Sequence, residues 1–381
     1  MSALPQTPAS HISPPLWLLF ELTYRCPLQC AFCYNPVDFA HHTQELPTSE
    51  WLRVLHEARA LGSVQLGLSG GEPLLRDDLE EITAEAHRLG YYINLITSGV
   101  GLSEARLQAL KSAGLDHVQL SFQDSTRELN DFLSHTRTFN LKQRVARWIK
   151  AAGYPMVLNC VIHRLNIDHL DKIIEMAVDI GADYLELANA QYYSWAHVNR
   201  EQLLPSRAQL QAAEEATNRW RARLGGRMRI LFVVPDYYEN RPKRCMNGWG
   251  STFMTVTPDG TVLPCHTARM LPGLSFPNVK TASLREIWYE SEAFNKFRGT
   301  GWMKEPCASC PEREKDLGGC RCQAYLLAHD PSAADPVCAK SPHRPVVDAA
   351  VAHAQRERGV EKPLVFRRRE NSIELANGPT G

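Results

Sequence analysis

The chain of 381 residues is long enough for two or three domains, and its 44% hydrophobic and 8% aromatic residues can fill a packed core. This composition excludes wholesale disorder. The 42 basic residues equal the 42 acidic residues, which excludes a nucleic-acid binder that acts through bulk positive charge. Eleven cysteines are the unusual feature, because disulfide pairing alone would leave one thiol over.

The N-terminal residues carry no basic region before their short apolar run at residues 16–20. Downstream, no run approaches the ~18 consecutive apolar residues of a membrane span. We therefore expect a cytoplasmic protein, in which thiols stay reduced and clustered cysteines bind metal or carry out redox chemistry. Residues 1–13 are rich in Pro, Ser and His, and we expect them to form a flexible tail.

From residue 14 onward, apolar β-like runs alternate with amphipathic helices, each of which ends at a glycine. Such alternation indicates a parallel sheet with right-handed crossovers. Six βα units are fewer than the eight that close a full barrel, so the sequence predicts an α/β fold, a partial (β/α)6 TIM-barrel-like crescent over residues 14–235. The expected strands lie at residues 16–23, 63–69, 91–98, 115–122, 155–163 and 182–189.

After Asp236 this alternation ends, and residues 252–265 predict a β-hairpin around a Pro-Asp-Gly turn. The residues that follow are rich in Gly, Pro and Cys, and segments of this kind usually need metal for stability. We therefore expect a second, cysteine-rich domain at residues 236–345. Residues 346–381 are charged and predict a mobile C-terminal tail.

The first cysteine group has the spacing C-x3-C-x2-C in the loop after the first strand. Three thiolates on one short loop suit three irons of a [4Fe–4S] cube, which leaves the fourth iron open to a ligand. A zinc site is the alternative, in which His41 or His42 would supply the fourth ligand. The group consists of Cys26, Cys30 and Cys33.

A Ser-Gly-Gly-Glu-Pro motif follows the second strand. Gly70 and Gly71 allow close approach of the backbone to a ligand, and Glu72 can pair with an ammonium group. Taken alone, the motif is equally consistent with a simple turn.

Polar residues also mark the third, fourth and fifth strands. Alternation along the fifth strand directs Asn159 into the crescent and makes Cys160 a buried packing residue. Ser121 lies in the fourth strand and Ser98 ends the third. These residues are ligand-binding candidates, and the alternative is that they only cap strand ends.

The second cysteine group lies in the later domain and contains a C-x2-C pair followed by an acidic residue. Its spacing fits either two iron–sulfur clusters or two structural zinc ions. The group and its acidic neighbour comprise Cys245, Cys265, Cys307, Cys310, Asp316, Cys320, Cys322 and Cys338.

The first cysteine motif, with Phe32 and Tyr34 on either side of its last cysteine, resembles the signature of the radical S-adenosylmethionine (SAM) superfamily. The glycine-rich motif resembles that family's second signature. The resemblance implies that the open iron chelates SAM, that one electron cleaves SAM, and that the resulting 5′-deoxyadenosyl radical abstracts a substrate hydrogen. It makes the following residues expected SAM contacts: Gly70, Gly71, Glu72, Ser98, Ser121 and Asn159.

Residues 245–338 resemble the SPASM extension of radical SAM peptide-modifying enzymes, but Asp316 stands where that family has a cysteine. The alternative is that Asp316 is a solvated loop residue. The resemblance implies two auxiliary iron–sulfur clusters, of [4Fe–4S] or [2Fe–2S] type. It assigns Cys245, Cys265, Cys320 and Cys322 to auxiliary cluster I, and Cys307, Cys310, Asp316 and Cys338 to auxiliary cluster II.

The aspartate, the Cys320-Arg321-Cys322 run and an aromatic segment after the sixth strand narrow the resemblance to the pyrroloquinoline quinone (PQQ) biosynthesis protein E family, over residues 14–345. Ser194 departs from this family, which usually has glycine there. The aromatic residues are expected either to line a peptide channel or to pack in the core. They are Tyr192, Tyr193 and Trp195.

This resemblance implies a carbon–carbon bond between a Glu and a Tyr of the ribosomal precursor peptide PqqA. It also implies the small peptide chaperone PqqD and an electron donor such as flavodoxin or ferredoxin as partners, with no nucleic acid and no membrane. The alternatives are another SPASM enzyme (a sulfatase maturase, a thioether-forming enzyme or a peptide decarboxylase) and a zinc-stapled barrel that binds peptides without redox chemistry.

Overall fold

The computed structural model describes residues 12–356 and 362–377. Within them, one twisted sheet has the strand order β7-β6-β5-β4-β3-β2-β1-β8-β9. Neighbouring strands are parallel except for the last pair, β8 and β9. The strands are β1 (Trp17–Glu21), β2 (Gln65–Ser69), β3 (Tyr92–Thr97), β4 (His117–Phe122), β5 (Met156–Ile162), β6 (Tyr184–Asn189), β7 (Arg229–Val233), β8 (Phe253–Val256) and β9 (Val262–Leu263).

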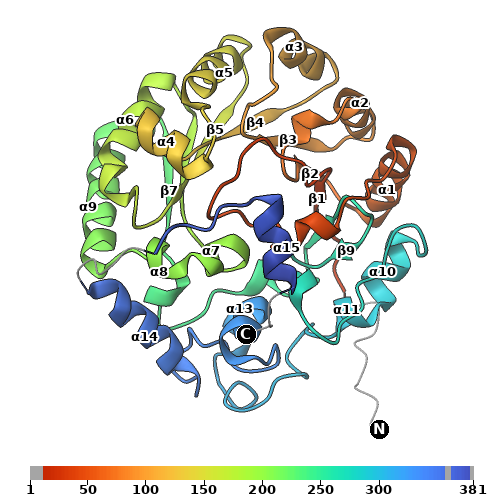
Figure 1. The fold of residues 1–381 in the computed structure, drawn as a ribbon. Helices are drawn as coiled ribbons and strands as arrows, with labels where there is room; N and C mark the ends of the chain where they lie inside the picture. Colours follow the sequence, from red (N-terminus) through yellow and green to blue (C-terminus); the bar gives the residue numbers. More distant parts are fainter. Residues whose placement is uncertain (1–11, 357–361, 378–381) are drawn as a thin grey trace.

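Helices surround this curved sheet on its outer side, as Figure 1 shows for α1, α2, α3, α5, α6 and α9. The predicted α/β partial barrel is therefore confirmed. The helices are α1 (Thr48–Leu61), α2 (Leu79–Arg88), α3 (Glu104–Ser112), α4 (Arg127–Ser134), α5 (Phe139–Ala151), α6 (Leu170–Ile180), α7 (Ser194–Val198), α8 (Arg200–Leu203), α9 (Arg207–Leu224), α10 (Leu284–Glu290), α11 (Glu292–Asn295), α12 (Arg313–Asp316), α13 (Arg321–Ala328), α14 (Arg344–Gln355) and α15 (Arg369–Asn377).

Strand alternation explains where the core and the open face lie. In β6, Leu185 and Leu187 are fully buried against the helices, whereas Glu186 between them is only partly buried. The same pattern of buried and partly buried residues runs along β3, β4 and β5. Apolar side chains therefore fill the space between sheet and helices, and the inner face of the crescent carries polar residues such as Asn159 beside apolar ones such as Val161.

The cysteine-rich region joins the same sheet. The predicted hairpin is confirmed, because β8 and β9 pair antiparallel, with Thr255 opposite Leu263. In addition, β8 pairs in parallel with β1, and Leu19 lies opposite Thr255. Pairing with β8 satisfies the backbone groups that would otherwise leave β1 as an open sheet edge. The expected domain boundary near residue 235 falls between β7 and β8.

The expectation of a mobile C-terminal tail does not hold for the described part of that tail. Val347 and Val351 of α14 are buried, and so are Arg367 and Ser372 near and within α15. Charged composition predicted a solvated segment, but the two valines pack in an apolar cluster, the guanidinium of Arg367 donates to a backbone carbonyl of the barrel, and the Ser372 hydroxyl accepts from a backbone amide. Residues 357–361 and 378–381 lie outside the described residues, as do residues 1–11 of the expected N-terminal tail.

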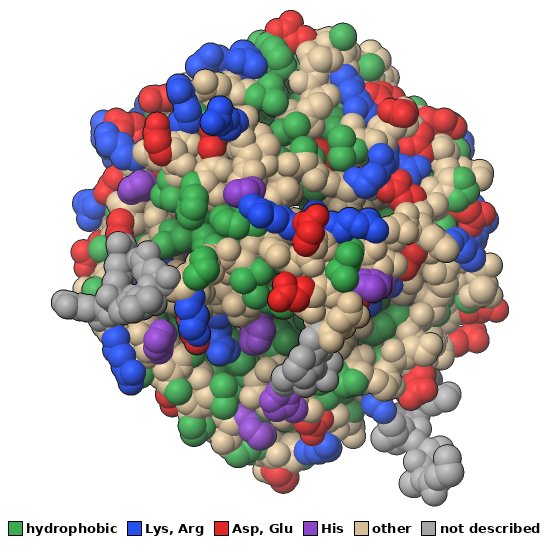
Figure 2. All heavy atoms as spheres, viewed as in Figure 1, with side chains coloured by type: hydrophobic (Ala, Val, Ile, Leu, Met, Phe, Trp, Pro, Cys, Tyr) green, Lys and Arg blue, Asp and Glu red, His purple; other side chains and the backbone are tan. Residues whose placement is uncertain are grey.

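No helix among the described residues is both long and apolar enough to cross a membrane. Figure 2 shows acidic and basic side chains interspersed over the face that carries α15. This mixture agrees with the equal numbers of acidic and basic residues in the sequence.

Candidate functional site

The first cysteine group lies in the loop that leaves the carboxyl end of β1. Cys26 and Cys30 act electrostatically on one another, and so do Cys30 and Cys33, so the structure brings the three thiols together. Burial raises the pKa of each thiol, that of Cys30 to about 12. A raised pKa means that forming the buried thiolates costs free energy. A bound metal would offset this cost, because the positive charge of the ion deprotonates a coordinating thiol.

The glycine-rich motif packs directly against this cysteine loop. The Gly71 amide donates to the Thr23 carbonyl at 2.6 Å, and the Glu72 amide donates to the Arg25 carbonyl at 2.8 Å. A Cβ atom on Gly70 would lie 2.4 Å from the Thr23 carbonyl oxygen, and one on Gly71 would lie 2.3 Å from the Arg25 carbonyl oxygen. These glycines therefore make room for the backbone of the cysteine loop, and their contact with a ligand stays a prediction.

Glu72 is fully buried, and its carboxylate holds the motif to the end of β3. One oxygen accepts hydrogen bonds from Leu74 N at 3.2 Å and Thr97 Oγ1 at 2.6 Å. The other accepts from Ser98 N at 2.8 Å and from the Ser98 hydroxyl. These four donors use the four acceptor positions of a carboxylate. The sequence predicted that the Glu72 carboxylate pairs with an ammonium group of a ligand. In the structure this carboxylate already accepts four hydrogen bonds from the protein, two of them from Ser98.

Two further predicted residues lie side by side on the inner face of the crescent. Ser121 of β4 is opposite Asn159 of β5, and Asn159 is opposite Glu186 of β6. The Asn159 amide donates to the Glu186 carboxylate at 2.8 Å. Sequence reasoning missed Glu186, although a single acidic residue within the apolar strand YLELAN was a usable signal. Cys160 is fully buried, which confirms its predicted packing role.

Lys142 is a second residue that the sequence did not single out. Its side chain is fully buried, and its ammonium donates to Gln123 Oε1 at 2.5 Å. Burial lowers its pKa to about 8, and the nearby Cys30 and Glu72 oppose that shift. An ammonium has three donors. Among the described residues, one of these three donors has an acceptor. The buried Lys142 ammonium beside the cysteine loop therefore has donors available for a ligand.

In the cysteine-rich region, four thiols pack in one cluster as a ring in which each interacts with two neighbours. Cys245 interacts with Cys265 and Cys320, and Cys322 interacts with the same two thiols from the other side. These interactions hold the pKa of Cys265 and Cys320 well below the usual value and raise the pKa of Cys245 and Cys322. The ring is the set predicted for auxiliary cluster I.

The remaining predicted ligands line one small pocket. Cys307, Cys310, Asp316 and Cys338 all contribute to its wall. The Asp316 carboxylate accepts from the Gly318 amide at 2.9 Å and is 9% exposed, so it is not a solvated loop residue. The structure thereby brings together the set predicted for auxiliary cluster II.

The arrangement of the cysteine groups differs from that of a site for a single metal ion. Among the described residues, no three His, Cys, Asp or Glu side chains converge as the ligands of one ion. In an iron–sulfur cluster each thiolate binds its own iron, so the ligands stand around a volume and not around one point. The chemistry of the donors, ten cysteines and one carboxylate, fits clusters of this kind.

A buried acid lies between the two cysteine regions. Glu21, the last residue of β1, is fully buried, and burial raises its pKa to about 7. One of its oxygens accepts from the Tyr24 hydroxyl at 2.9 Å, and the other has no partner among the described atoms. Tyr34, next to Cys33, meets His266, next to Cys265, with ring centroids 4.9 Å apart. The two cysteine regions therefore touch each other near this acid.

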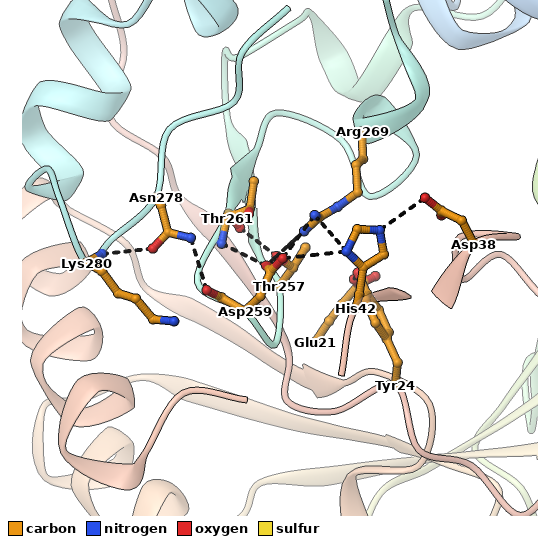
Figure 3. A network of polar contacts seen from close by, with 10 residues as sticks. All are labelled: Glu21, Tyr24, Asp38, His42, Thr257, Asp259, Thr261, Arg269, Asn278 and Lys280. Carbon is orange, nitrogen blue, oxygen red and sulfur yellow. Dashed lines mark hydrogen bonds and ion pairs between the residues drawn. The ribbon is translucent and has the colours of Figure 1, made fainter. Parts of the chain in front are cut away.

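A polar network reinforces this contact, as Figure 3 shows. The Arg269 guanidinium donates to both oxygens of Asp259, at 2.9 and 3.0 Å, and to Thr257 Oγ1 at 2.8 Å. It also lies 3.4 Å from His42 Nδ1, while His42 Nε2 lies 3.2 Å from Asp38. The network thus joins the turn after β8 to the segment that follows the cysteine loop, and His42, an alternative zinc ligand in the sequence analysis, is part of it.

The three aromatic residues after β6 have different environments. Tyr192 packs on Tyr237, with ring centroids 5.1 Å apart, and Trp195 is fully buried near Phe39. Tyr193 is only partly buried and lies close enough to the cysteine ring to interact with Cys320 electrostatically. Of the three, Tyr193 alone remains a candidate channel residue.

Both parts of this arrangement match models of known protein families. Residues 20–177 match the family model of the radical SAM superfamily, and residues 245–311 match that of SPASM, an iron–sulfur cluster-binding domain.

The fold is also similar to that of solved proteins. Streptococcus suis SuiB bound to S-adenosylmethionine has a TM-score of 0.67 at 17% sequence identity, covering 87% of this chain and 77% of SuiB. SuiB bound to its precursor peptide SuiA has the same TM-score and coverage at 18% identity. The protein anSMEcpe with bound AdoMet and the Cp18Cys peptide has a TM-score of 0.62 at 17% identity, covering 96% of this chain and 99% of that protein. At these identities the likeness concerns the fold.

The packing of the two loops gives a first prediction. Gly71→Ala should displace the cysteine loop, because its Cβ would meet the Arg25 carbonyl oxygen at 2.3 Å. We expect iron at the first cysteine group to fall by more than half after anaerobic reconstitution, measured as iron per chain. Gly301→Ala is the matched control, since a Cβ there meets nothing within 4 Å. Equal iron content in both variants would show that the loop contact is unimportant.

Proposed function

We propose that this chain, in which a radical SAM domain precedes a SPASM domain, is an enzyme that modifies a ribosomal precursor peptide. Its reaction joins the side chains of a Glu and a Tyr in the PQQ precursor peptide by a carbon–carbon bond. Solved proteins of similar fold include one bound to a precursor peptide and one bound to a peptide and AdoMet, which supports a peptide substrate.

One observation carries the choice of this reaction among SPASM enzymes. The extra cysteine, Cys322, closes the ring of four thiols, and Asp316 completes the pocket that holds Cys307, Cys310 and Cys338. The two departures from the usual SPASM pattern are therefore complementary, with four ligands for each auxiliary cluster. This aspartate-containing pattern is the feature that the chain shares with the PQQ family.

In this proposal Cys26, Cys30 and Cys33 hold a [4Fe–4S] cluster. When bound, the cluster and SAM supply a carbon radical strong enough to remove an unactivated hydrogen from the substrate. The polar row of Ser121 and Asn159 binds SAM from the inner face of the crescent.

We assign the SAM carboxylate to Lys142. A buried ammonium with unused donors suits a carboxylate, because charge-assisted hydrogen bonds are strongest where water is excluded. The backbone of residues 70–72, held against the cysteine loop, forms the floor of the SAM site. The Glu72 carboxylate maintains that floor through its four internal hydrogen bonds.

The proposal includes the bounds 14–235 and 236–345 for the two domains. It also includes a small peptide chaperone that presents the substrate and a flavodoxin- or ferredoxin-type electron donor. The inner face of the crescent is the place where a presented peptide would meet SAM.

The decisive experiment is an anaerobic reaction of the reconstituted protein with SAM, reductant, precursor peptide and chaperone, read by peptide mass. We expect a loss of two hydrogens and a fragmentation pattern that shows a Glu–Tyr crosslink. Precursor peptides with the reacting Tyr replaced by Phe, or the reacting Glu by Gln, are the controls. Loss of carbon dioxide, a thioether or an aldehyde would indicate another SPASM reaction, and a colourless zinc protein with no reaction would indicate the peptide-binding barrel.

Asp316 gives a second prediction within this proposal. Asp316→Ala removes one ligand of auxiliary cluster II, so we expect fewer irons per chain and loss of crosslinking, with cleavage of SAM retained. Asp316→Cys should restore the iron content. Glu314→Ala changes an exposed acid two residues away and should leave the iron content unchanged. Full iron content in Asp316→Ala would contradict the ligand assignment.

Lys142 predicts a pH dependence for SAM binding. Because burial lowers the pKa of its ammonium to about 8, the cation is present below that pH and is lost as the pH rises above it. We expect the SAM dissociation constant, measured by equilibrium dialysis, to increase above pH 8. Lys142→Met should weaken binding about tenfold at pH 7, the loss expected for a hydrogen bond to a charged group.

Lys142→Arg provides the control, since an arginine stays charged across this range and should remove the pH dependence. Unchanged SAM affinity in Lys142→Met would refute the assignment while leaving the cluster ligands untouched.

A further inference from the structure

A C-terminal segment lies across the first cysteine loop. We call residues 362–377 the strap; in Figure 1 its helix α15 lies in front of the centre of the crescent. The Val365 amide donates to Asn199 Oδ1 at 2.7 Å, and Asn199 Nδ2 donates to the Val365 carbonyl at 2.8 Å. Farther along, the Ser372 hydroxyl accepts from the Ala40 amide at 3.0 Å. The strap is therefore fixed on both sides of the loop.

The strap also contacts the loop between two of its cysteines. The Arg367 amide donates to the Gln29 carbonyl at 3.2 Å, and Arg368 Nε donates to the Gln29 side chain at 3.1 Å. The Phe366 ring lies 4.6 Å from the His135 ring and 5.9 Å from the Phe132 ring. These contacts hold the strap on the loop, and the side chain of Arg367 is buried against the start of the loop at Tyr24.

Arg367 is a buried cation whose described partners carry no full negative charge. Its side chain is 4% exposed. The guanidinium donates to the Tyr24 carbonyl at 2.6 Å and lies 3.9 Å from the centroid of the Phe39 ring, while its Nε has no partner among the described atoms. A buried charge is costly unless an opposite charge faces it.

The cysteine loop lies against this cation. The Tyr24 carbonyl that accepts from the guanidinium lies two residues before Cys26, and the Gln29 carbonyl that accepts from the Arg367 amide lies between Cys26 and Cys30. In agreement with this placement, burial raises the pKa of all three thiols of the loop, and the Arg367 charge opposes that rise.

We propose that Arg367 is the counter-charge of the iron–sulfur cluster held by Cys26, Cys30 and Cys33, and that the strap positions Arg367 beside this cluster. Reduction adds one negative charge to a cluster whose three thiolates already carry negative charge. A buried guanidinium stabilises the reduced state more than the oxidised state and so raises the reduction potential, which depends on net charge and solvent exposure. Arg367 is therefore a positioning residue for electron uptake, and the inference rests on the cluster assigned under the proposed function.

The test compares Arg367→Gln with Arg367→Lys and with Arg369→Gln, which removes an exposed charge two residues away. The readout is an anaerobic redox titration of the cluster, followed by electron paramagnetic resonance. The resonance signal of this cluster is the one that disappears in the Cys33→Ala variant.

In Arg367→Gln we expect the ratio of reduced to oxidised cluster at a fixed applied potential to fall at least tenfold, equivalent to about 59 mV for one electron. Arg367→Lys should recover most of this shift, and Arg369→Gln should match the unaltered protein. An unshifted potential in Arg367→Gln, or the same shift in Arg369→Gln, would overturn the inference.

If Arg367→Gln does not retain the cluster, the result for Arg367→Lys decides between a charge role and a packing role of Arg367. Retention of the cluster at a potential near that of the unaltered protein supports the charge role, whereas loss in both variants indicates a packing role and overturns it. Failure of the unaltered protein to bind iron at these cysteines would instead refute the proposed function. The two failures are therefore distinguishable.

Discussion

The parallel pairing of β1 with a neighbour on each side is the constraint on which the site depends. On one side β1 pairs with β2, which leads into the glycine-rich motif, and on the other with β8, which leads through its hairpin to Cys265. The cysteine loop leaves the same strand. Three segments that are far apart in sequence therefore start from adjacent strands of one rigid sheet, and the spacing of the two cysteine regions is set by backbone hydrogen bonds.

Around this sheet, a few hydrogen bonds and ion pairs provide partners for the buried polar groups. The four hydrogen bonds to Glu72 and the paired bonds between Arg269 and Asp259 fix loops that carry no regular structure of their own. The Glu72 carboxylate links the end of β2 to the end of β3, and Arg269 also contacts His42 in the segment after the cysteine loop. The sheet is rigid, and the polar contacts fix the loops that carry the cysteines relative to it.

Much of this could be predicted from sequence because its signals are local. Apolar runs separated by helices that end at glycine gave the parallel sheet, and cysteine spacing gave both ligand groups. The sequence did not predict the role of Glu72, of Lys142 or of Glu186, because each depends on which strands become neighbours. Nor did it predict the strap, since the arginines of residues 367–369 have the composition of a solvated tail. Ser194 adopts φ 51, a left-handed conformation that explains why glycine is usual at that position in the resembled family.

The strap also has a consequence for the order of assembly. Its hydrogen bonds to the cysteine loop and the residues after it span 332 and 343 positions of the chain. Contacts of such long range form after the segments between them have folded, because their loop-closure entropy must first be offset. During folding, the cysteine loop therefore stays uncovered until the strap docks, and the strap is the last segment to pack over this loop.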